Sequence, residues 1–211
     1  MTHQNSSRNL FIIGAGSLGQ LTLDAALEMC KYKTILFIDD GVEKGDRVLG
    51  VEVVGGLGYL NKLDKQEHDF IIAISNNKVR KSISKTYDLN YVNIIHPKCS
   101  ISRFANIKGE GNIILSNTSI DPNVSIESHV IINKNNSIGH DTVLEDFSQV
   151  SPGCNIGGFV KLKSMTFLGL GVSVLPQKTI GEETVVGAGA VVTKDLPSKT
   201  IAVGVPAKIV E

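Results

Sequence analysis

A chain of 211 residues can hold one large domain or two small ones. Its formal net charge is zero, so no overall field attracts it to nucleic acid or to an anionic membrane. No apolar run is long enough to cross a bilayer, and the polar first residues lack the core of a signal peptide. Three widely spaced cysteines suit neither a disulfide framework nor a zinc site. We therefore expect a cytoplasmic protein with no metal, no nucleic acid partner and no transmembrane segment.

The N-terminal part of the chain alternates between apolar runs and helical patterns. It predicts strands over residues 10–13, 34–38, 70–74 and 91–95, and helices over about 17–31 and 78–87. Strands that alternate with helices in this order form a small parallel sheet with right-handed crossovers. We therefore expect a Rossmann-like domain over residues 1–96, with the junction at His96-Pro97, because a proline ends the element before it.

A glycine-rich loop lies between the first predicted strand and the first predicted helix. It reads Gly14-x-Gly16-x-x-Gly19, and Asp39 follows the last glycine by twenty residues. Glycines in this context let the backbone approach a phosphate, and the helix N-terminus offers free N–H groups. Because the α/β part is only about half of a complete dinucleotide fold, we expect a nucleotide diphosphate linked to a group such as a sugar rather than NAD. A loop that serves only helix–strand packing is the alternative.

Beyond the junction, an aliphatic residue recurs at every sixth position. Leu, Ile and Val make up only 62 of the 211 residues, so thirteen consecutive aliphatic positions are not expected by chance. The thirteen are Ile120, Ile126, Ile132, Ile138, Leu144, Val150, Ile156, Leu162, Leu168, Val174, Ile180, Val186 and Val192. A period of six is typical of a parallel β-helix with triangular coils of about 18 residues, whereas a β-sandwich would give a period of two. The region therefore predicts roughly five stacked coils in a domain of residues 97–211.

Two smaller regularities accompany this period. The same spacing runs from Ile101 to Ile113, and one extra residue separates Ile113 from Ile120. The fourth residue after each repeat aliphatic is usually small or valine from Val124 to Ala190, with Asn136 and Lys178 as the exceptions. Glycine directly follows the aliphatic at five positions, which fits tight corners where a Cβ would be in the way: Gly139, Gly157, Gly169, Gly181 and Gly187.

The predicted β-helix carries two histidines in its clear register, His129 and His140. We expect them on different faces, so they do not supply the cluster of imidazoles that a zinc site needs. The carboxylate of Asp141, directly after His140, can fix the tautomer of the imidazole and raise its basicity, provided that the segment bends at a corner. His140 is therefore the candidate general base, and His129 is expected to be a corner or interface residue.

Five short motifs are together more specific than any one of them. They are Ile13-Gly14-Ala15-Gly16, Phe37-Ile38-Asp39-Asp40, Ala73-Ile74-Ser75-Asn76-Asn77 followed by Arg80, Ile138-Gly139-His140-Asp141, and Val203-Gly204-Val205-Pro206-Ala207-Lys208. With these motifs the chain resembles, over nearly its whole length, the sugar O-acyltransferase family typified by PglD and NeuD. Members of that family are bacterial acetyltransferases of nucleotide sugars or of sialic acid.

This resemblance implies a left-handed parallel β-helix of hexapeptide repeats, a homotrimer, and acetyl-CoA bound along the β-helix between neighbouring subunits. It implies that His140 is the general base and that Asp141 supports it. The residues that it implies for nucleotide-sugar binding are Gly14, Gly16, Ser17, Leu18, Asp39, Asp40, Gly56, Ser75 and Asn76. The residues that it implies for acetyl-CoA binding are Gln149, Gly158, Leu170 and Ala188.

Two positions depart from the family pattern. Many relatives have a histidine where this chain has Leu18, and PglD-like proteins have a histidine that contacts acetyl-CoA where it has Gln149. Glutamine can still donate and accept hydrogen bonds, whereas leucine cannot. We therefore expect Leu18 to affect which sugar or nucleotide is bound, and Gln149 to change one cofactor contact without removing the base.

The expected reaction is direct N-acetylation by acetyl-CoA of a nucleotide-linked 4-amino-dideoxy sugar, with a backbone N–H, for example of Gly158, at the oxyanion. O-acetylation of a sialic acid or of another sugar hydroxyl is the alternative within the same class. Two other classes are an NAD-dependent oxidoreductase and a non-catalytic β-helix scaffold. A thermal shift with NAD but not with acetyl-CoA would favour the first of these, and no shift with either ligand would favour the second.

Overall fold

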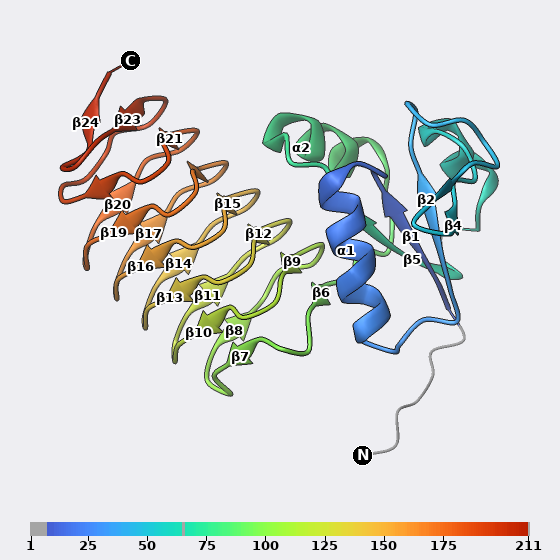
Figure 1. Cartoon of the computed structure of the whole chain (residues 1–211), viewed down its shortest axis with the longest axis horizontal. Coiled ribbons are helices and arrows are strands. Elements are labelled where there is room, and N and C mark those ends of the chain that lie inside the picture. The colour runs from blue at the N-terminus through green and yellow to red at the C-terminus, as the bar shows by residue number, and fades with distance from the viewer. Residues whose placement is uncertain (1–7, 65, 211) are drawn as a thin grey trace. The chain divides into compact units, whose positions relative to one another are not determined.

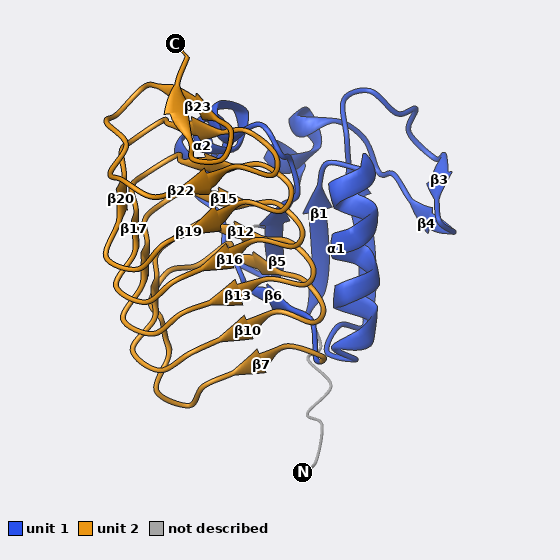
Figure 2. Ribbon diagram, turned by 60° about the vertical axis from the view of Figure 1, so that its left-hand side comes forward, with its two compact units in different colours: residues 1–97 blue, residues 98–211 orange. Residues whose placement is uncertain are grey.

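The computed structural model describes residues 8–64 and 66–210. The chain divides into two compact units, residues 1–97 and residues 98–211 (Figure 2). The division falls one residue after the boundary expected from the sequence. Across the described residues, no helix has both the length and the apolar character needed to span a membrane.

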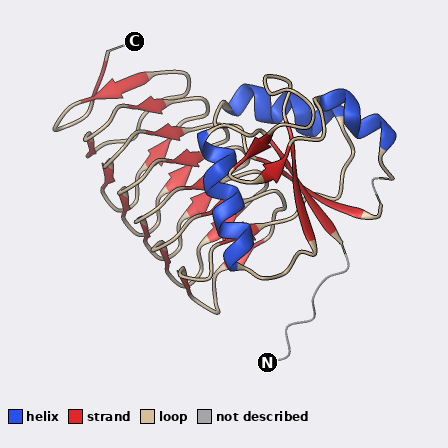
Figure 3. Ribbon diagram, turned by 45° about the vertical axis from the view of Figure 1, so that its right-hand side comes forward, coloured by secondary structure: helices blue, strands red, loops and turns tan. Residues whose placement is uncertain are grey.

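The first unit contains a three-stranded parallel sheet (Figure 3). Its strands are β1 (Asn9–Ile13), β2 (Thr34–Ile38) and β5 (His68–Ile72), in the order β2-β1-β5. The helix α1 (Ser17–Glu28) connects β1 to β2, and α2 (Asn77–Thr86) follows β5. These elements confirm the predicted parallel α/β arrangement, and they bring the carboxyl ends of all three strands to one edge of the sheet.

Between β2 and β5 the chain forms two elements that the sequence did not predict. The short strands β3 (Arg47–Val48) and β4 (Val51–Glu52) form an antiparallel hairpin. The 3₁₀ helix η1 (Leu57–Lys62) follows this hairpin and buries Leu60. The core of this unit is mainly aliphatic, and within it the rings of Phe11 and Phe70 stack at a centroid distance of 5.5 Å.

The expected strand over residues 91–95 is wrong for most of its length. Only β6 (Ile94–Ile95) is a strand, and Tyr91 makes a single parallel bridge to Phe70 beside it. The hydrogen bonds to β5 end at Val92, whose N–H donates to the carbonyl of Phe70 at 3.0 Å.

The second unit is a parallel β-helix made of three sheets of two- or three-residue strands (Figure 1). The first sheet comprises β7 (Ser100–Ile101), β10 (Ser119–Ile120), β13 (Ser137–Ile138), β16 (Asn155–Ile156), β19 (Ser173–Val174) and β22 (Val191–Val192). The second comprises β8 (Asn106–Ile107), β11 (Ser125–Ile126), β14 (Val143–Leu144), β17 (Lys161–Leu162) and β20 (Thr179–Ile180). Within residues 98–211, the third comprises β9 (Ile113–Ile114), β12 (Ile131–Ile132), β15 (Gln149–Val150), β18 (Phe167–Leu168), β21 (Val185–Val186), β23 (Ile201–Val203) and the antiparallel β24 (Lys208–Ile209).

The six-residue period produces this arrangement as predicted. Residues 18 apart pair across adjacent coils, as Ile120 pairs with Ile138 and Ile138 with Ile156. All thirteen repeat aliphatics are buried, with at most 3% of their surface exposed. The first sheet has six strands, one coil more than the roughly five predicted, because the stretch from Ile101 completes a coil of its own.

The extra residue of the first coil lies elsewhere than the sequence suggested. Ile114, and not Ile113, pairs with Ile132 in the repeat register, so the longer spacing falls between Ile107 and Ile114. The corner of residues 108–112 absorbs it. Both Ile113 and Ile114 are aliphatic and fully buried, so the sequence pattern alone fits either choice.

Corners of the coils rest on one backbone feature. The third residue after each aliphatic of the repeat register from Ile114 to Val186 has a positive φ, although only three of these residues are glycine: Asn117, Asn123, His129, Asn135, Asp141, Phe147, Gly153, Phe159, Met165, Gly171, Gln177, Glu183 and Gly189. The predicted corner glycines stand two residues earlier, where a Cβ would meet the next coil. Inside the coil, Asn136 is accommodated because its Oδ1 accepts the N–H of Cys154 at 2.7 Å.

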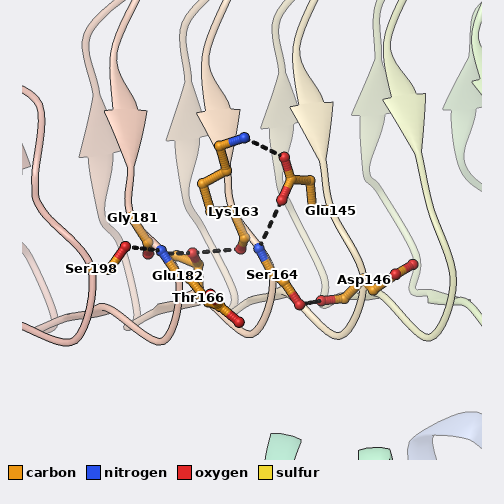
Figure 4. A network of polar contacts seen from close by, with 8 residues as sticks. All are labelled: Glu145, Asp146, Lys163, Ser164, Thr166, Gly181, Glu182 and Ser198. Carbon is orange, nitrogen blue, oxygen red and sulfur yellow. Dashed lines mark hydrogen bonds and ion pairs between the residues drawn. The ribbon is translucent and has the colours of Figure 1, made fainter.

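One row of corners also carries a polar network between coils (Figure 4). Lys163 Nζ lies 2.7 Å from Glu145 Oε1, and the N–H of Ser164 donates to the other oxygen of Glu145. Thr166 Oγ1 donates to the carbonyl of Gly181 at 3.1 Å. These contacts join three successive coils, although the exposed ion pair adds little stability by itself.

We predict that Gly181→Ala destabilises the β-helix, because its Cβ would lie 2.5 Å from the carbonyl carbon of Pro197. Overpacking of this kind costs about 1–3 kcal/mol, which a lowered midpoint in thermal unfolding will show. Gly153→Asn is the matched control, since Gly153 has open space around it and asparagine already occupies the same corner position at Asn135. Equal midpoints for the two variants would contradict this account of the corners.

Candidate active site

The glycine-rich loop turns at the carboxyl end of β1. Gly14 has a φ of +105°, and a Cβ there would lie 2.9 Å from the carbonyl oxygen of Ala73. A Cβ on Gly19 would collide with the carbonyl oxygen of Gly14. The N-cap residue of α1 is Gly16, which has no side chain to accept a hydrogen bond from the helix. The first N–H groups of α1 are therefore suited to binding an anion.

Asp39, at the end of β2, holds this loop in place. Its Oδ2 accepts the N–H of Ala15 at 2.7 Å, and its Oδ1 accepts the N–H of Gly41 at 2.7 Å. The carboxylate therefore joins the loop after β1 to the loop after β2. Its neighbour Asp40 accepts the N–H of Leu57 at 2.9 Å.

The loop after β5 completes this edge of the sheet. Arg80 of α2 is fully buried, and its guanidinium donates to the carbonyl of Ile74 at 2.7 Å and to Asn77 Oδ1 at 2.8 Å. Burial lowers the pKa of Arg80 to about 9, so the side chain stays charged at neutral pH. Asn76 caps α2, because its Oδ1 accepts the N–H groups of Lys78 and Val79.

Two adjoining cavities, of about 320 and 190 Å³, lie at these carboxyl ends. Ligands of open parallel sheets bind at such ends. Seven of the nine residues expected to bind a nucleotide sugar line the cavities: Gly14, Gly16, Ser17, Leu18, Asp39, Asp40 and Ser75.

The other two expected residues, Gly56 and Asn76, do not line either cavity. At Gly56, a Cβ would collide with the carboxylate of Asp40, so the glycine permits this close approach. The smaller cavity has an aliphatic wall that the motif did not indicate: Ile13, Ile38, Leu57, Ile74, Val79 and Ile83. Ile13, Ile38 and Ile74 stand within the quoted motifs, but no spacing in the sequence brings Leu57, Val79 or Ile83 to them.

In the β-helix, His140 and Asp141 occupy a corner between the first and second sheets. The Nδ1 of His140 lies 2.8 Å from Oδ2 of Asp141, and 55% of the histidine side chain is exposed. The positive φ of Asp141 turns the chain so that the two neighbours face each other, which a flat strand would prevent. In the coil before, Asn123 donates from Nδ2 to the remaining oxygen of Asp141 at 3.2 Å.

The next coil flanks the other side of the imidazole. A Cβ on Gly158 would lie 2.7 Å from both Cε1 and Nε2 of His140, so only glycine leaves room for the ring. Phe159 meets the ring edge-on at a centroid distance of 5.1 Å and remains half exposed. His140 is thus held in an open setting where Nε2 can reach a ligand.

The four residues expected to bind acetyl-CoA do not gather around His140 within one chain. Gly158 is beside it, but the exposed Leu170 and Ala188 stand one above the other at the corner between the third and first sheets. Gln149 lies on the outer side of β15 in the third sheet and is 7% exposed. The set therefore spans different corners and faces of the β-helix.

Metal-ligating clusters and the buried cysteine of the β-helix bear on what else this site could do. The described ranges, 8–64 and 66–210, contain no group of three or more His, Cys, Asp or Glu that could hold a metal ion. Cys154 points into the coil and donates to the carbonyls of Ser151 and Gly169, each at 3.2 Å. Burial raises the pKa of its thiol, which disfavours the reactive thiolate.

His129 is a corner residue, as expected, and is 5% exposed. Its ring stacks on that of Phe147 at a centroid distance of 4.9 Å.

Comparison with known proteins adds independent information. The profile of the PglD N-terminal domain matches residues 9–87. GDP-perosamine N-acetyltransferase from Escherichia coli O157:H7 is 29% identical over 190 residues, which are 86% of this chain and 84% of that protein. The chain spans 41% of the length of a putative acetyltransferase from Schizosaccharomyces pombe, to which it is 42% identical over 85 residues.

Solved structures match over nearly the whole chain. One is a mutant of perosamine N-acetyltransferase from Caulobacter crescentus, in complex with CoA and GDP-perosamine. It is 32% identical to this chain with a TM-score of 0.90, and the match covers 96% of this chain and 97% of the C. crescentus chain. The acetyltransferase domain of PglB from Neisseria gonorrhoeae FA1090, in complex with acetyl coenzyme A, is 30% identical with a TM-score of 0.93 and covers 97% and 100%.

Fold, site and comparisons together define an acetyltransferase with a Rossmann-like first unit and a parallel β-helix. The chain belongs to the PglD/NeuD-like family of sugar acetyltransferases, which confirms the resemblance read from its motifs.

We predict that Asp39→Ala loosens the glycine-rich loop, because the N–H groups of Ala15 and Gly41 lose their acceptor. The loss should cost about 1–3 kcal/mol in the free energy of unfolding. Hydrogen exchange at both amides should become faster, whereas the exposed Asp46→Ala serves as the control. Unchanged exchange at Ala15 in Asp39→Ala would show that the carboxylate does not hold the loop.

Proposed function

We propose that this protein transfers the acetyl group of acetyl-CoA to the amine of a nucleotide-linked 4-amino-dideoxy sugar, with His140 as the general base. The observation that carries the base assignment is the 2.8 Å contact between Nδ1 of His140 and Asp141. A carboxylate at this nitrogen favours the tautomer whose Nε2 carries a lone pair. That Nε2 lies beside Gly158, on the exposed side of the corner.

The reaction that this geometry suits is a direct transfer. Nε2 of His140 takes a proton from the amine as the amine nitrogen bonds to the thioester carbon. The tetrahedral oxyanion would be stabilised by a backbone N–H, for which Gly158, beside the imidazole, is the candidate. The carbon–sulfur bond then breaks, and the imidazolium returns its proton to the CoA thiolate. No acyl-enzyme is required, because the amine attacks the thioester directly, and the thiol of Cys154 is buried inside the coil.

Similarity suggests which nucleotide sugar should be tested first. The relatives from E. coli and C. crescentus are GDP-perosamine N-acetyltransferases, and both match most of this chain. The cavities at the glycine-rich loop offer helix N–H groups for a diphosphate and an aliphatic wall beside them. We therefore assign the nucleotide sugar to this edge of the first unit, with a GDP-linked amino sugar as the first candidate.

We also propose a homotrimer in which acetyl-CoA lies between neighbouring β-helices. Within one chain, Leu170 and Ala188 stand at a different corner from His140. A neighbouring subunit could bring its own copy of that corner to the imidazole, and packing three prisms around an axis would bury apolar surface. A monomeric mass in analytical ultracentrifugation would contradict this assembly.

We propose a cytoplasmic location for the protein, which cell fractionation would test.

We predict that His140→Ala lowers kcat for acetyl transfer at least about a hundredfold, because general-base catalysis contributes about 10²–10⁴ in rate. Release of the CoA thiol from acetyl-CoA and GDP-perosamine is the measurement. The unfolding midpoint should stay close to that of the parent protein, since the side chain is largely exposed. Glu182→Ala, at the same hexad position of another corner, is the control; near-normal turnover in His140→Ala would exclude the base role.

Ligand-induced stabilisation tests the substrate class. We predict that GDP raises the unfolding midpoint more than UDP, dTDP or CMP, and that acetyl-CoA raises it further, because ligands that bind only the folded state stabilise it. The same panel should include NAD, for which we expect no shift. No response to any nucleotide would favour acetylation of a sugar hydroxyl that carries no nucleotide, and turnover with sialic acid would establish that alternative.

A further inference from the structure

Asn123 lies one coil before the candidate base and contacts its carboxylate partner. Its Nδ2 donates to Oδ1 of Asp141 at 3.2 Å, while Oδ2 of the same carboxylate lies 2.8 Å from Nδ1 of His140. Each oxygen of Asp141 therefore has a different side-chain partner. The three residues form a chain from an amide through a carboxylate to the imidazole.

We propose that Asn123 is a positioning residue for acetyl transfer, which acts on His140 through Asp141. This inference rests on the proposed function, because it presupposes that His140 is the base. Asn123 itself does not touch the imidazole; its amide limits the orientations that the carboxylate of Asp141 can adopt.

The exposure of Asp141 explains why such a restraint is needed. One third of its side chain is accessible, so water competes with His140 for the carboxylate. A carboxylate that rotates freely would release Nδ1 for part of the time and allow the proton to move to Nε2. With the Asn123 amide on Oδ1, Oδ2 stays directed at Nδ1, and the lone pair of Nε2 stays available for the amine.

Backbone stacking keeps Asn123 at the required place. Asn123 and Asp141 occupy equivalent corners of successive coils, with φ values of 63° and 57°. The N–H of Asn123 donates to the carbonyl of Phe104 at 3.2 Å, and that of Asp141 donates to the carbonyl of Pro122 at 3.2 Å. Asparagine adopts this backbone more readily than most residues and supplies a donor, so it meets both requirements.

The opposite side of the imidazole is restrained independently. The N–H of Phe159 donates to the carbonyl of His140 at 2.9 Å, and the two rings meet edge-on. These contacts restrain the backbone and the ring of His140 without Asn123. What Asn123 contributes is the orientation of the Asp141 carboxylate.

Two substitutions separate the amide from the corner that carries it. Asn123→Gly keeps the positive φ and removes the amide, whereas Asn123→Asp keeps the shape and replaces the donor by a second carboxylate. We expect each to lower kcat about threefold to tenfold, the range that one hydrogen bond supports, with KM for both substrates unchanged. Lys199→Gly is the matched control, because the exposed Lys199 has the same backbone conformation, with a φ of 59°, at a corner between the second and third sheets, and its kcat should equal that of the parent protein.

A double-mutant cycle distinguishes positioning from a structural role. In the background of Asp141→Gly, which also keeps the positive φ, Asn123→Gly should have no further effect on kcat. The imidazole ¹⁵N spectrum of the unliganded protein supplies a readout besides activity: the fraction of His140 protonated at Nε2 should rise in Asn123→Gly and stay unchanged in Lys199→Gly.

The outcomes divide as follows. The positioning role would be overturned if Asn123→Gly lowered kcat by the same factor in the parent protein and in the Asp141→Gly background. It would also be overturned if both Asn123 variants had the kcat of the parent protein and an unchanged ¹⁵N spectrum. An inactive His140→Ala together with fully active Asn123 variants would retain the base and reject only Asn123. A fully active His140→Ala would reject the proposed function, and the positioning role with it.

Discussion

The β-helix depends on one constraint: each coil must return to the same register after 18 residues, so that its backbone hydrogen-bonds to the coils on either side. This pairing fixes which residues of neighbouring coils stand above one another. It stacks the corner of Asn123 under that of Asp141, and the corner of Asp141 under that of Phe159. Backbone stacking therefore assembles the candidate catalytic corner from residues that are far apart in sequence. A rigid backbone supplies the preorganisation that acid–base chemistry requires.

Much of this architecture can be predicted from the sequence because the constraint is periodic. The buried aliphatics follow directly from the six-residue spacing, since each one fills the same position of a hexad. The register of the first coil could not be predicted, because Ile113 and Ile114 satisfy the pattern equally well. Nor could the positive-φ corners, since residues as different as Asn135, Phe159 and Met165 occupy them. Backbone geometry is conserved among the hexads there, and side-chain type is not.

The candidate site divides in the same way between local and long-range information. His140 and Asp141 are neighbours, so their pairing could be anticipated once a corner was assumed. The contact of Asn123 with Asp141 spans 18 residues and depends on stacking, and no local motif announces it. In the first unit, the glycine-rich loop could be recognised from its spacing. Asp39 joins the loops after β1 and β2, and the buried Arg80 holds the loop after β5. Both roles depend on tertiary contacts that secondary-structure propensity does not encode.

The five-residue corner between β8 and β9 shows how this fold can accept length changes. Gly109 comes so close to the next coil that a Cβ would collide with the backbone of Glu127 and Ser128, and Gly111 adopts a positive φ of 71°. With these two glycines the corner accommodates one more residue, and the following strand keeps its partner. An insertion within a strand would instead rotate every later side chain between interior and exterior. Corners are therefore where members of such a fold can gain loops during evolution, and so change the ligands they accept, while the stack itself remains the same.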